Sequence, residues 1–371
     1  MSVADAEQTD EKSRPAFPTR RALIGAGAIS GIVWTLSYRP APDPAWIPVK
    51  SASPWSARDG AGLIVYNNRL WLTGGSAPKV IDLGDSWSTS DGITWHKEIE
   101  QSSWTQAAQS MNVAFAGRMW RMGGFIEEET KFHPINEIWS SADGQNWALV
   151  EPSPPWRPRA GGTLVVFREK LWLLGGASQY DKLLFNDVWS TENGVDWTSV
   201  NSQAPWKPRA FHTAVAHDGR LWVMGGGNWS KDPTLYGDVW STPDGINWKQ
   251  HTDQAAWQGR VWATAASYAG LLWIMGGFIG SPRGGTNDIW YSRDGRHWLP
   301  YLSATPKWAP RLAQSAVVFE HRLWITAGSN GDYYNDVWYL DLGGHWSGYT
   351  AFKRILASIP HPVDFIRSLF L

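Results

Sequence analysis

Residues 206–250 have the sequence WKPRAFHTAVAHDGRLWVMGGGNWSKDPTLYGDVWSTPDGINWKQ. This stretch predicts four short β-strands, at 210–216, 221–224, 238–241 and 247–250. Strands one and two, and strands three and four, are each joined by Asp-Gly. This dipeptide is typical of a type I′ turn, which needs positive φ at both central residues. A diglycine ends the second strand, and a longer loop leads to the third. The stretch therefore predicts one four-stranded antiparallel sheet.

The same unit recurs along the chain with a period of about fifty residues, which is typical of repeat architectures. Four tryptophans occupy matching positions in each of six units, which accounts for 24 of the 28 tryptophans. Only Trp34, Trp46, Trp229 and Trp262 fall outside this pattern. The diglycine that marks each unit is found at Gly74-Gly75, Gly123-Gly124, Gly175-Gly176, Gly225-Gly226 and Gly276-Gly277, with Ala327-Gly328 in the last unit.

A single four-stranded sheet cannot bury both of its faces, but neighbours in a closed ring cover them. The aligned tryptophans supply large contact areas between such sheets. Charged residues make up only 18% of the chain, as expected when only loops and outer edges meet water. The fold class predicted for residues 46–348 is therefore all-β, a six-bladed β-propeller of four-stranded antiparallel blades.

Three motifs in each unit resemble those of the kelch-repeat family. A lead-in such as Trp156-Arg157-Pro158-Arg159 precedes the first strand, an aromatic residue precedes the diglycine, and an element such as Asn186-Asp187-Val188-Trp189 follows. The resemblance covers about residues 46–346 and implies a six-bladed propeller, like the central propeller of galactose-oxidase-like relatives. The copper-radical site of those relatives needs a Cys–Tyr crosslink, which this chain without cysteine cannot form.

Two segments compete for the outermost strand of the last blade. Trp46-Ile47-Pro48-Val49 precedes Trp55 by nine residues, just as Trp197-Thr198-Ser199-Val200 precedes Trp206, and a segment beginning at Trp346 is the alternative. Pro48 is tolerated on an edge strand. We expect the N-terminal segment to close the ring and so tie the two ends of the propeller together.

The two ends of the chain have a different character. Residues 1–45 are predicted to be an export signal or a membrane anchor followed by a Pro-rich linker. Arg20 and Arg21 precede an apolar run and resemble a twin-arginine signal. The uncharged run 22–38 is near the lower limit for spanning a bilayer, so membrane association through it stays open. The expected location is periplasmic or extracellular, with anchoring to the membrane as the alternative to release. The tail, residues 349–371, is predicted to form short helices that dock on the propeller or touch a membrane surface.

Composition excludes several functional classes. The formal net charge is −1, whereas a general nucleic-acid binder usually carries a basic excess, so no nucleic-acid partner is expected. The absence of cysteine excludes a disulfide framework and a cysteine nucleophile. The chain has neither the spacing of zinc ligands nor a phosphate-binding loop nor a Gly-x-Ser-x-Gly elbow. We therefore expect no metal and no cofactor.

The loops after the diglycines differ most between units, and variable loops on a rigid scaffold carry function. Five units also place an arginine near this face, three residues after the leading tryptophan, where the second unit has Ala107. Such arginines can form a cationic mouth for carboxylate or sulfate ligands, or structural bridges to neighbouring loops. The five are Arg58, Arg159, Arg209, Arg260 and Arg311.

Departures from the repeat form a second group of candidates. His212, Gln314 and Ser110 lie three residues after the arginine or its replacement, where the other units have Ala or Gly. Each is a candidate ligand contact or a hydrogen-bonded core group. Trp229 and Trp262 lie outside the repeating scaffold, and Trp229 in its polar loop is the better candidate for stacking on a sugar.

These observations predict an exported propeller that binds a glycan or a protein ligand through its long-loop face. One alternative is a sugar-active enzyme (epimerase, mutarotase or lyase) with acid/base groups at the axial mouth. Another is a structural interaction module of the cell envelope. The fold cannot choose among them, because propellers host all three.

Overall fold

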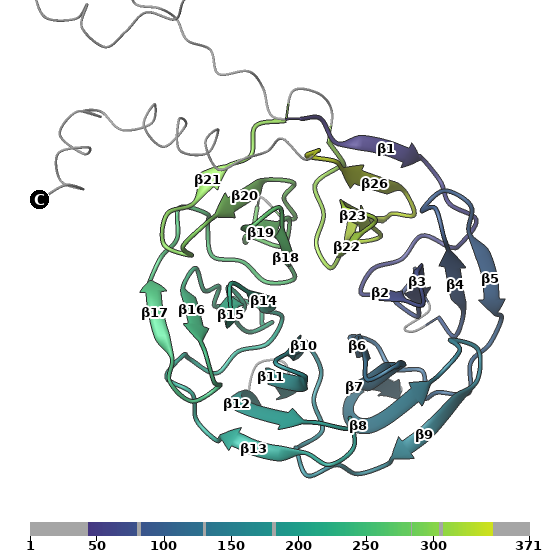
Figure 1. Cartoon of the computed structure of the whole chain (residues 1–371), viewed down its shortest axis with the longest axis horizontal. Coiled ribbons are helices and arrows are strands. Elements are labelled where there is room, and N and C mark those ends of the chain that lie inside the picture. Colours follow the sequence, from purple (N-terminus) through teal and green to yellow (C-terminus); the bar gives the residue numbers. More distant parts are fainter. Residues whose placement is uncertain are drawn as a thin grey trace, which may run out of the picture. The chain divides into compact units, whose positions relative to one another are not determined.

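The protein is described by a computed structural model that covers residues 44–343 except 80–82, 129–130, 180–182, 283 and 304–306. Six four-stranded antiparallel sheets surround a central axis (Figure 1). Within these described residues there is no helix, and none is therefore available to cross a membrane. The predicted six-bladed all-β propeller is confirmed. The predicted export signal, the run 22–38 and the C-terminal tail lie outside the described residues.

In blades 1 to 5 the strands follow chain order from the axis outward. Blade 1 contains β2 (Gly62–Tyr66), β3 (Arg69–Thr73), β4 (Ser86–Thr89) and β5 (His96–Ile99). Blade 2 contains β6 (Met111–Phe115), β7 (Arg118–Glu128), β8 (Lys131–Ser141) and β9 (Trp147–Glu151). Blade 3 contains β10 (Thr163–Phe167), β11 (Lys170–Gln179), β12 (Leu183–Thr191) and β13 (Thr198–Asn201). Blade 4 contains β14 (Thr213–His217), β15 (Arg220–Met224), β16 (Val239–Thr242) and β17 (Lys249–Thr252). Blade 5 contains β18 (Thr264–Tyr268), β19 (Leu271–Met275), β20 (Ile289–Ser292) and β21 (Leu299–Pro300).

Blade 6 is built from both ends of the propeller. Its strands are β22 (Ser315–Phe319), β23 (Arg322–Thr326), β26 (Val337–Leu340) and, outermost, β1 (Ile47–Lys50), while β24 (Ser329–Asn330) and β25 (Asp332–Tyr333) form a small hairpin in its loop. Ile47 of β1 pairs with Tyr339 of β26 in antiparallel register. The predicted closure by the N-terminal segment is confirmed.

Each blade pairs its leading tryptophan with the tryptophan of its outermost strand, edge to face. In blade 4 the rings of Trp206 and Trp248 have centroids 5.8 Å apart and planes at 77°. In blade 6 the partner of Trp308 is Trp46, at 6.2 Å and 89°. The N-terminal segment therefore supplies the fourth tryptophan of the last blade together with its fourth strand.

In five of the six blades, a third tryptophan joins the blade to the next one. In blade 4 the indole Nε1 of Trp222 donates to the backbone oxygen of His217 at 3.0 Å. The six-membered ring of Trp222 lies against the hairpin glycine of blade 5, where a Cβ on Gly295 would come within 2.1 Å of it. Blades therefore interlock through a ring that only glycine can accommodate. The same contact joins Trp324 to Gly92, Trp71 to Gly144, Trp120 to Gly194 and Trp172 to Gly245.

The two kinds of Asp-Gly turn differ in conformation. Asp218 and Gly219 both have positive φ, 44° and 68°, as a type I′ turn requires. In the hairpin between β4 and β5, positive φ is confined to Gly92 (74°). There the carboxylate of Asp91 accepts the backbone N–H groups of Ile93 and Thr94 at 2.7 and 2.8 Å. The type I′ prediction was wrong for this hairpin, because the carboxylate holds the turn instead of a second left-handed residue.

Candidate functional site

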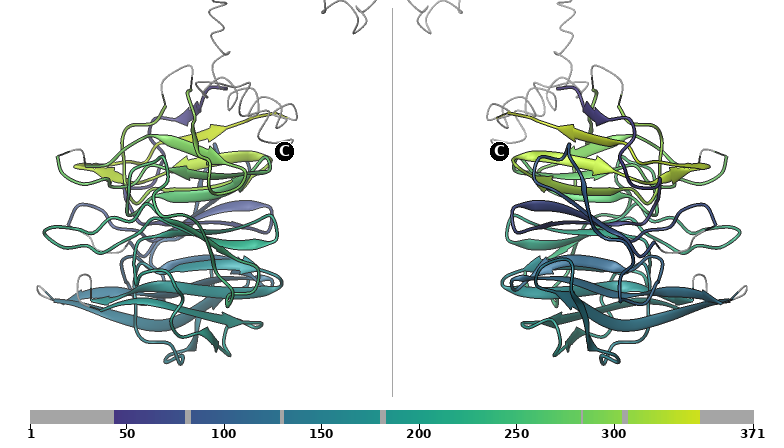
Figure 2. Two further views of the ribbon diagram at one scale, coloured as in Figure 1. Left: turned by 90° about the vertical axis from the view of Figure 1, so that its left-hand side faces the viewer. Right: turned by 90° about the vertical axis from the view of Figure 1, so that its right-hand side faces the viewer.

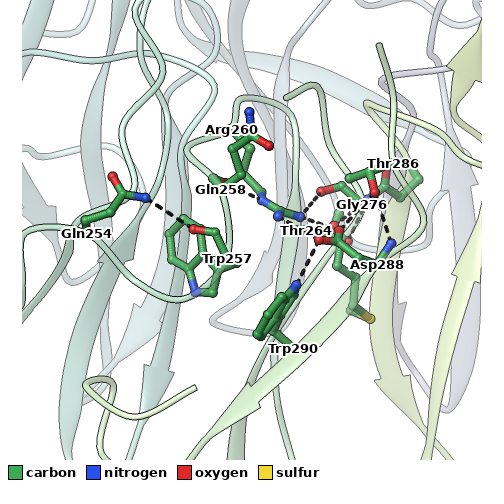
Figure 3. Close-up of polar contacts among 11 residues, drawn as sticks. Gln254, Trp257, Gln258, Arg260, Thr264, Gly276, Thr286, Asp288 and Trp290 are labelled. Carbon is green, nitrogen blue, oxygen red and sulfur yellow. Dashed lines mark hydrogen bonds and ion pairs between the residues drawn. The ribbon is translucent and has the colours of Figure 1, made fainter. Parts of the chain in front are cut away.

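The five predicted arginines lie inside the blades. Arg58, Arg159, Arg209 and Arg311 have no exposed surface, and Arg260 is 1% exposed. Each forms a two-pronged ion pair with the aspartate two residues before the third-strand tryptophan of its own blade. In blade 5, Arg260 lies 2.6 and 2.9 Å from the two carboxylate oxygens of Asp288 (Figure 3). The other pairs are Arg58–Asp85, Arg159–Asp187, Arg209–Asp238 and Arg311–Asp336.

The environment of each pair is complete without a ligand. The Arg260 guanidinium also donates to the carbonyl of Gly276 at 2.9 Å and lies 5.6 Å from the ring centroid of Trp257, while Trp290 Nε1 donates to Asp288 at 2.8 Å (Figure 3). Burial alone would raise the pKa of Asp288, but the hydrogen bond and charge of Arg260 lower it below its usual value. These contacts fix the loop before β18 against β20, so the arginines act within the blade scaffold.

Blade 2 reaches a similar arrangement by another route. Where the other blades have the arginine and aspartate, it has Ala107 and Glu137. Arg121, from β7, places its guanidinium 5.1 Å from the ring centroid of the leading Trp104. It donates to the backbone oxygen of Ala107 at 2.8 Å. A cation therefore lies over the leading tryptophan in blade 2 as well, supplied from the second strand.

A pocket lies on the axis at the diglycine face, where one dipeptide from each blade converges just before the innermost strand. Its volume is about 150 Å³. The lining dipeptides are Gly60-Ala61, Gln109-Ser110, Gly161-Gly162, Phe211-His212, Trp262-Ala263 and Ala313-Gln314. The extended hairpins β7–β8 and β11–β12 project beyond the ring (Figure 2).

The first residue of every lining dipeptide has a left-handed backbone, with φ between 51° and 61°. Their backbone groups form hydrogen bonds from blade to blade around the axis. Trp262 N–H donates to Phe211 O at 2.9 Å, Phe211 N–H to Gly161 O at 2.7 Å, and Gly60 N–H to Ala313 O at 2.8 Å, across the junction of blades 1 and 6. The pocket wall is therefore rigid. Aromatic residues in this conformation carry a strain of about 1–3 kcal/mol, which is typical of functional sites.

Two predicted residues that line this pocket carry buried polar atoms without hydrogen-bond partners, and their side chains turn toward the preceding blade, His212 toward Gly175 and Gln314 toward Gly276. His212 is 6% exposed, and neither ring nitrogen has a hydrogen-bond partner. Gln314 is 4% exposed; its amide nitrogen donates to Met275 O at 2.8 Å, but its Oε1 accepts nothing. Buried polar atoms without partners cost about 1–3 kcal/mol each, so these two departures from the repeat do not serve packing. Burial, followed by the charge of Arg209, lowers the pKa of His212 to about 3, so its imidazole is neutral.

The two tryptophans that fall outside the repeat meet each other beside this pocket. The ring centroids of Trp229 and Trp262 lie 4.5 Å apart, and Phe211 lies 4.5 Å from the other side of Trp262. Phe278 adds a fourth ring, 5.2 Å from Trp229. Trp229 is 38% exposed. These four residues, which we call the aromatic wall, connect an exposed indole to the pocket lining.

The structure thus brings His212, Gln314, Ser110, Trp262 and Trp229 to one site and places the five arginines elsewhere. The Ser110 hydroxyl donates to Ala107 O at 2.7 Å. Sequence reasoning missed Gln109 and Phe211. The available signal was asymmetry, because Phe211 and Trp262 stand where two other units have glycine.

The pocket offers hydrogen bonds and aromatic contacts rather than charge. Among its lining residues there is no carboxylate and no ammonium or guanidinium group. Within the described residues, no three His, Cys, Asp or Glu side chains gather as a metal site would require. The site therefore suits a neutral, polar ligand with a flat apolar face.

Comparisons with known proteins support the fold alone. No protein-family model matches the chain, and none of the curated proteins is significantly similar to it. Among solved structures, one described as the structure of YjhT superposes with a TM-score of 0.65 at 15% identity, covering 79% of this chain and 97% of that one. At this identity the likeness extends to the propeller architecture.

Proposed function

We propose that this protein is an exported, kelch-type propeller that binds a neutral saccharide unit in its axial pocket. The observation that carries the proposal is an uncharged axial pocket that is lined by His212 and Gln314, two polar departures from the repeat, and flanked by the aromatic wall. A saccharide presents hydroxyl groups, which can both donate and accept, together with C–H faces that stack on aromatic rings.

The size of the pocket restricts the ligand. A volume of about 150 Å³ would hold roughly five waters at ~30 Å³ each. That is well below the ~300–1,000 Å³ of pockets that enclose drug-sized ligands. The fit favours one sugar unit, either a monosaccharide or the end of a longer glycan. In the latter case the exposed face of Trp229 extends the contact outside the pocket.

The absence of charge in the lining favours a neutral ligand over an acidic one. Burying a carboxylate beside neutral groups would cost several kcal/mol without a cationic partner. The nearby Arg209 is already paired with Asp238 at 2.6 and 2.8 Å.

The enzyme alternative receives less support from the pocket. Acid/base catalysis is most efficient when the catalytic pKa lies near the operating pH, whereas the pKa of His212 is about 3. Asp59 precedes the lining residue Gly60, but its carboxylate accepts a hydrogen bond from Ser329 at 2.6 Å and does not line the pocket. Binding is therefore the better proposal.

A calorimetric titration of the propeller with neutral and acidic mono- and disaccharides tests the proposal. Gln314→Ala removes a buried acceptor, and Trp229→Ala removes the exposed ring; each should weaken binding by roughly tenfold. Ile246→Ala is the matched control, because Ile246 is 57% exposed on the opposite, hairpin face of blade 4. Equal affinity in all three variants would remove the axial site. Binding of a protein partner but of no saccharide would favour the protein-ligand or envelope-module alternatives.

Export is tested separately by replacing Arg20 and Arg21 with lysine in the full chain. A receptor that reads paired arginines should then fail to translocate the protein. Continued translocation of the variant would contradict the twin-arginine route, and fractionation of the unaltered protein with membranes would favour the anchor.

A further inference from the structure

A second hollow lies at the other end of the innermost strands, between blades 4 and 5. Its volume is about 450 Å³, and it is lined by His217, Asp218, Ser267, Gly270 and Arg293. These residues come from the ends of β14 and β18, the turn after β18 and the hairpin after β20. The hollow is therefore separate from the axial pocket, which lies before the starts of the same strands.

The hollow coincides with a departure from the repeat. The last residue of the innermost strand is aromatic in five blades, and in blade 4 it is His217. The imidazole takes the position of the missing ring. Its centroid lies 6.4 Å from Trp222 at 60°, compared with 6.4 Å and 54° between Phe167 and Trp172 in blade 3. The five aromatic residues are Tyr66, Phe115, Phe167, Tyr268 and Phe319.

Where this residue is tyrosine, its hydroxyl is hydrogen-bonded to backbone carbonyl oxygens of the next blade. The Tyr66 hydroxyl lies 2.7 Å from the carbonyl oxygen of Gly117 and 2.6 Å from that of Ala142. These acceptors belong to the first turn and the outer hairpin of blade 2. At the junction of blades 5 and 6, the Tyr268 hydroxyl lies 2.9 Å from the carbonyl oxygen of His321, in the first turn, and 3.3 Å from that of Leu340, one residue before the position that matches Ala142.

The same two acceptor positions exist in blade 5, without a tyrosine to use them. Gly270 corresponds to Gly117 in the first turn, and Arg293 corresponds to Ala142 in the outer hairpin. Both residues line the hollow. The imidazole of His217 instead forms a hydrogen bond within the hollow lining, with its Nδ1 2.8 Å from the hydroxyl of Ser267. The place that a tyrosine hydroxyl would take beside Gly270 and Arg293 is therefore unfilled by the chain and is accessible from the hollow.

A second departure makes the floor of this hollow polar. At the position of Ser267 the other five blades have Val or Ala. Arg293 and Asp218, both exposed, have no ion-pair partner among the described residues. The guanidinium of Arg293 is available to lie over an aromatic ring, a contact that attracts through the ring's quadrupole.

We infer that this hollow is a binding site for a small molecule carrying a hydroxyaryl group, whose hydroxyl takes the position that Tyr66 and Tyr268 fill at their own blade junctions. The ligand hydroxyl would donate toward the carbonyl oxygens of Gly270 and Arg293, while its ring extends outward beside the Arg293 side chain. A phenol suits two carbonyl acceptors better than an alkyl alcohol, because it is the stronger donor.

The probe is p-cresol, which has the shape of a tyrosine side chain, titrated into the isotope-labelled propeller and followed by NMR. We expect saturable shifts of Gly270 and Arg293 at up to about 10 mM, the range of a fragment this small. Toluene, which lacks only the hydroxyl, should bind at least about fivefold more weakly. N-acetyl-tyrosinamide shows whether the site also takes the phenol of a peptide.

Two substitutions of His217 distinguish a site that binds the hydroxyl group from an apolar void that only accepts the ring. His217→Tyr supplies the chain's own hydroxyl and should abolish p-cresol binding while raising the melting temperature. His217→Phe fills the ring position but leaves the carbonyl oxygens free, so it should still bind p-cresol. Arg293→Ala, on an exposed residue that folding does not need, should weaken binding severalfold.

Loss of p-cresol binding in His217→Phe as well as in His217→Tyr would overturn the inference, because the hollow would then be an apolar void. Undiminished binding in His217→Tyr, or shifts confined to the axial pocket, would also overturn it. The absence of any saturable shift in the unaltered protein would do so independently of whether the variants fold. None of these outcomes bears on saccharide binding at the opposite face.

Discussion

Removing the carboxylate of Asp238 should destabilise the propeller far more than removing an exposed one. Asp238→Ala leaves the guanidinium of Arg209 with no exposed surface and without its two carboxylate contacts, at 2.6 and 2.8 Å. Trp240 loses the acceptor of its indole N–H, at 2.8 Å, in the same step. An uncompensated buried charge costs about 3–5 kcal/mol. Contacts to Gly225 O and to the rings of Trp206 and Tyr236 remain, but none of these carries negative charge.

The size of the propeller sets the expected change in melting temperature. At about 2.1 cal/mol/K per residue, roughly 300 residues give an unfolding entropy of about 0.6 kcal/mol/K, so 3–5 kcal/mol corresponds to a fall of about 5–8 °C. Thermal unfolding followed by circular dichroism measures this shift, and urea unfolding measures the free energy if heating is irreversible. Glu100→Ala is the control, because the Lys97–Glu100 pair is also 2.7 Å long but 37% and 81% exposed. Such a surface pair contributes at most about 1 kcal/mol.

A double-mutant cycle decides whether the cost comes from the pair itself. Arg209→Met with Asp238→Ala removes both charges, so the double variant should be more stable than the sum of the single effects predicts, by about 1–3 kcal/mol. Additive effects of the two substitutions, or a loss below about 1 kcal/mol in Asp238→Ala, would refute the reasoning. The pair would then not be the bridge that its geometry indicates.

Three further predictions concern glycine, acid and the axial pocket. Gly295→Ala and Gly219→Ala impose similar backbone strain, because the two glycines have φ of 70° and 68°. Only at Gly295 does the added Cβ meet an indole, within 2.1 Å. In urea unfolding, Gly295→Ala should therefore lose at least about 1–3 kcal/mol more stability than Gly219→Ala does. Although partial burial opposes it, hydrogen bonds to the backbone lower the pKa of Asp91 and Asp244 to about 2. Their contribution is thus present above about pH 4 and lost as the pH falls toward 2; a urea midpoint unchanged between pH 5 and 2 would contradict this. Because the pKa of His212 is about 3, saccharide affinity measured by calorimetry should stay constant from pH 5 to 8, and a titration near pH 6.5 would mean that the imidazole is not buried as described.

The fold could be predicted from the sequence because the residues that determine it recur periodically and lie close together in the chain. The tryptophan spacing, the diglycines and the spare segment at Trp46 indicated six blades and their closure, and the structure has both. The arginine bridges were harder to identify because Arg159 and Asp187 are 28 residues apart and meet only once the strands pair. One signal was present nonetheless. The unit that lacks the arginine, at Ala107, is also the unit with glutamate in place of the aspartate, at Glu137.

The candidate site was harder to predict from the sequence, because its shape depends on the backbone conformation of the lining residues. The residue types of Phe211 and Trp262 do not predict a left-handed backbone, because bulky side chains disfavour that conformation. The repeat supplies the missing information only by comparison, because glycine stands at the corresponding positions Gly60 and Gly161. Trp229 was identifiable as an outlier, but its contact with Trp262 at 4.5 Å joins two separate loops and could not be derived from spacing.

Deviations from sixfold symmetry mark both of the proposed binding sites, whereas the shared residues do not. The five arginine–aspartate pairs and the tryptophans that recur in all six blades pack within and between the blades. Blades 4 and 5 depart from the repeat at both ends of their innermost strands, with His212 and Trp262 at one end and His217 and Ser267 at the other. At His217 the hydroxyl bridge that Tyr66 makes to the next blade is missing, as it also is at the three junctions where this residue is Phe115, Phe167 or Phe319. We therefore propose that the junction of blades 4 and 5, with the polar hollow at one end of its innermost strands and Phe211 and Trp262 of the aromatic wall at the other, is organised for binding.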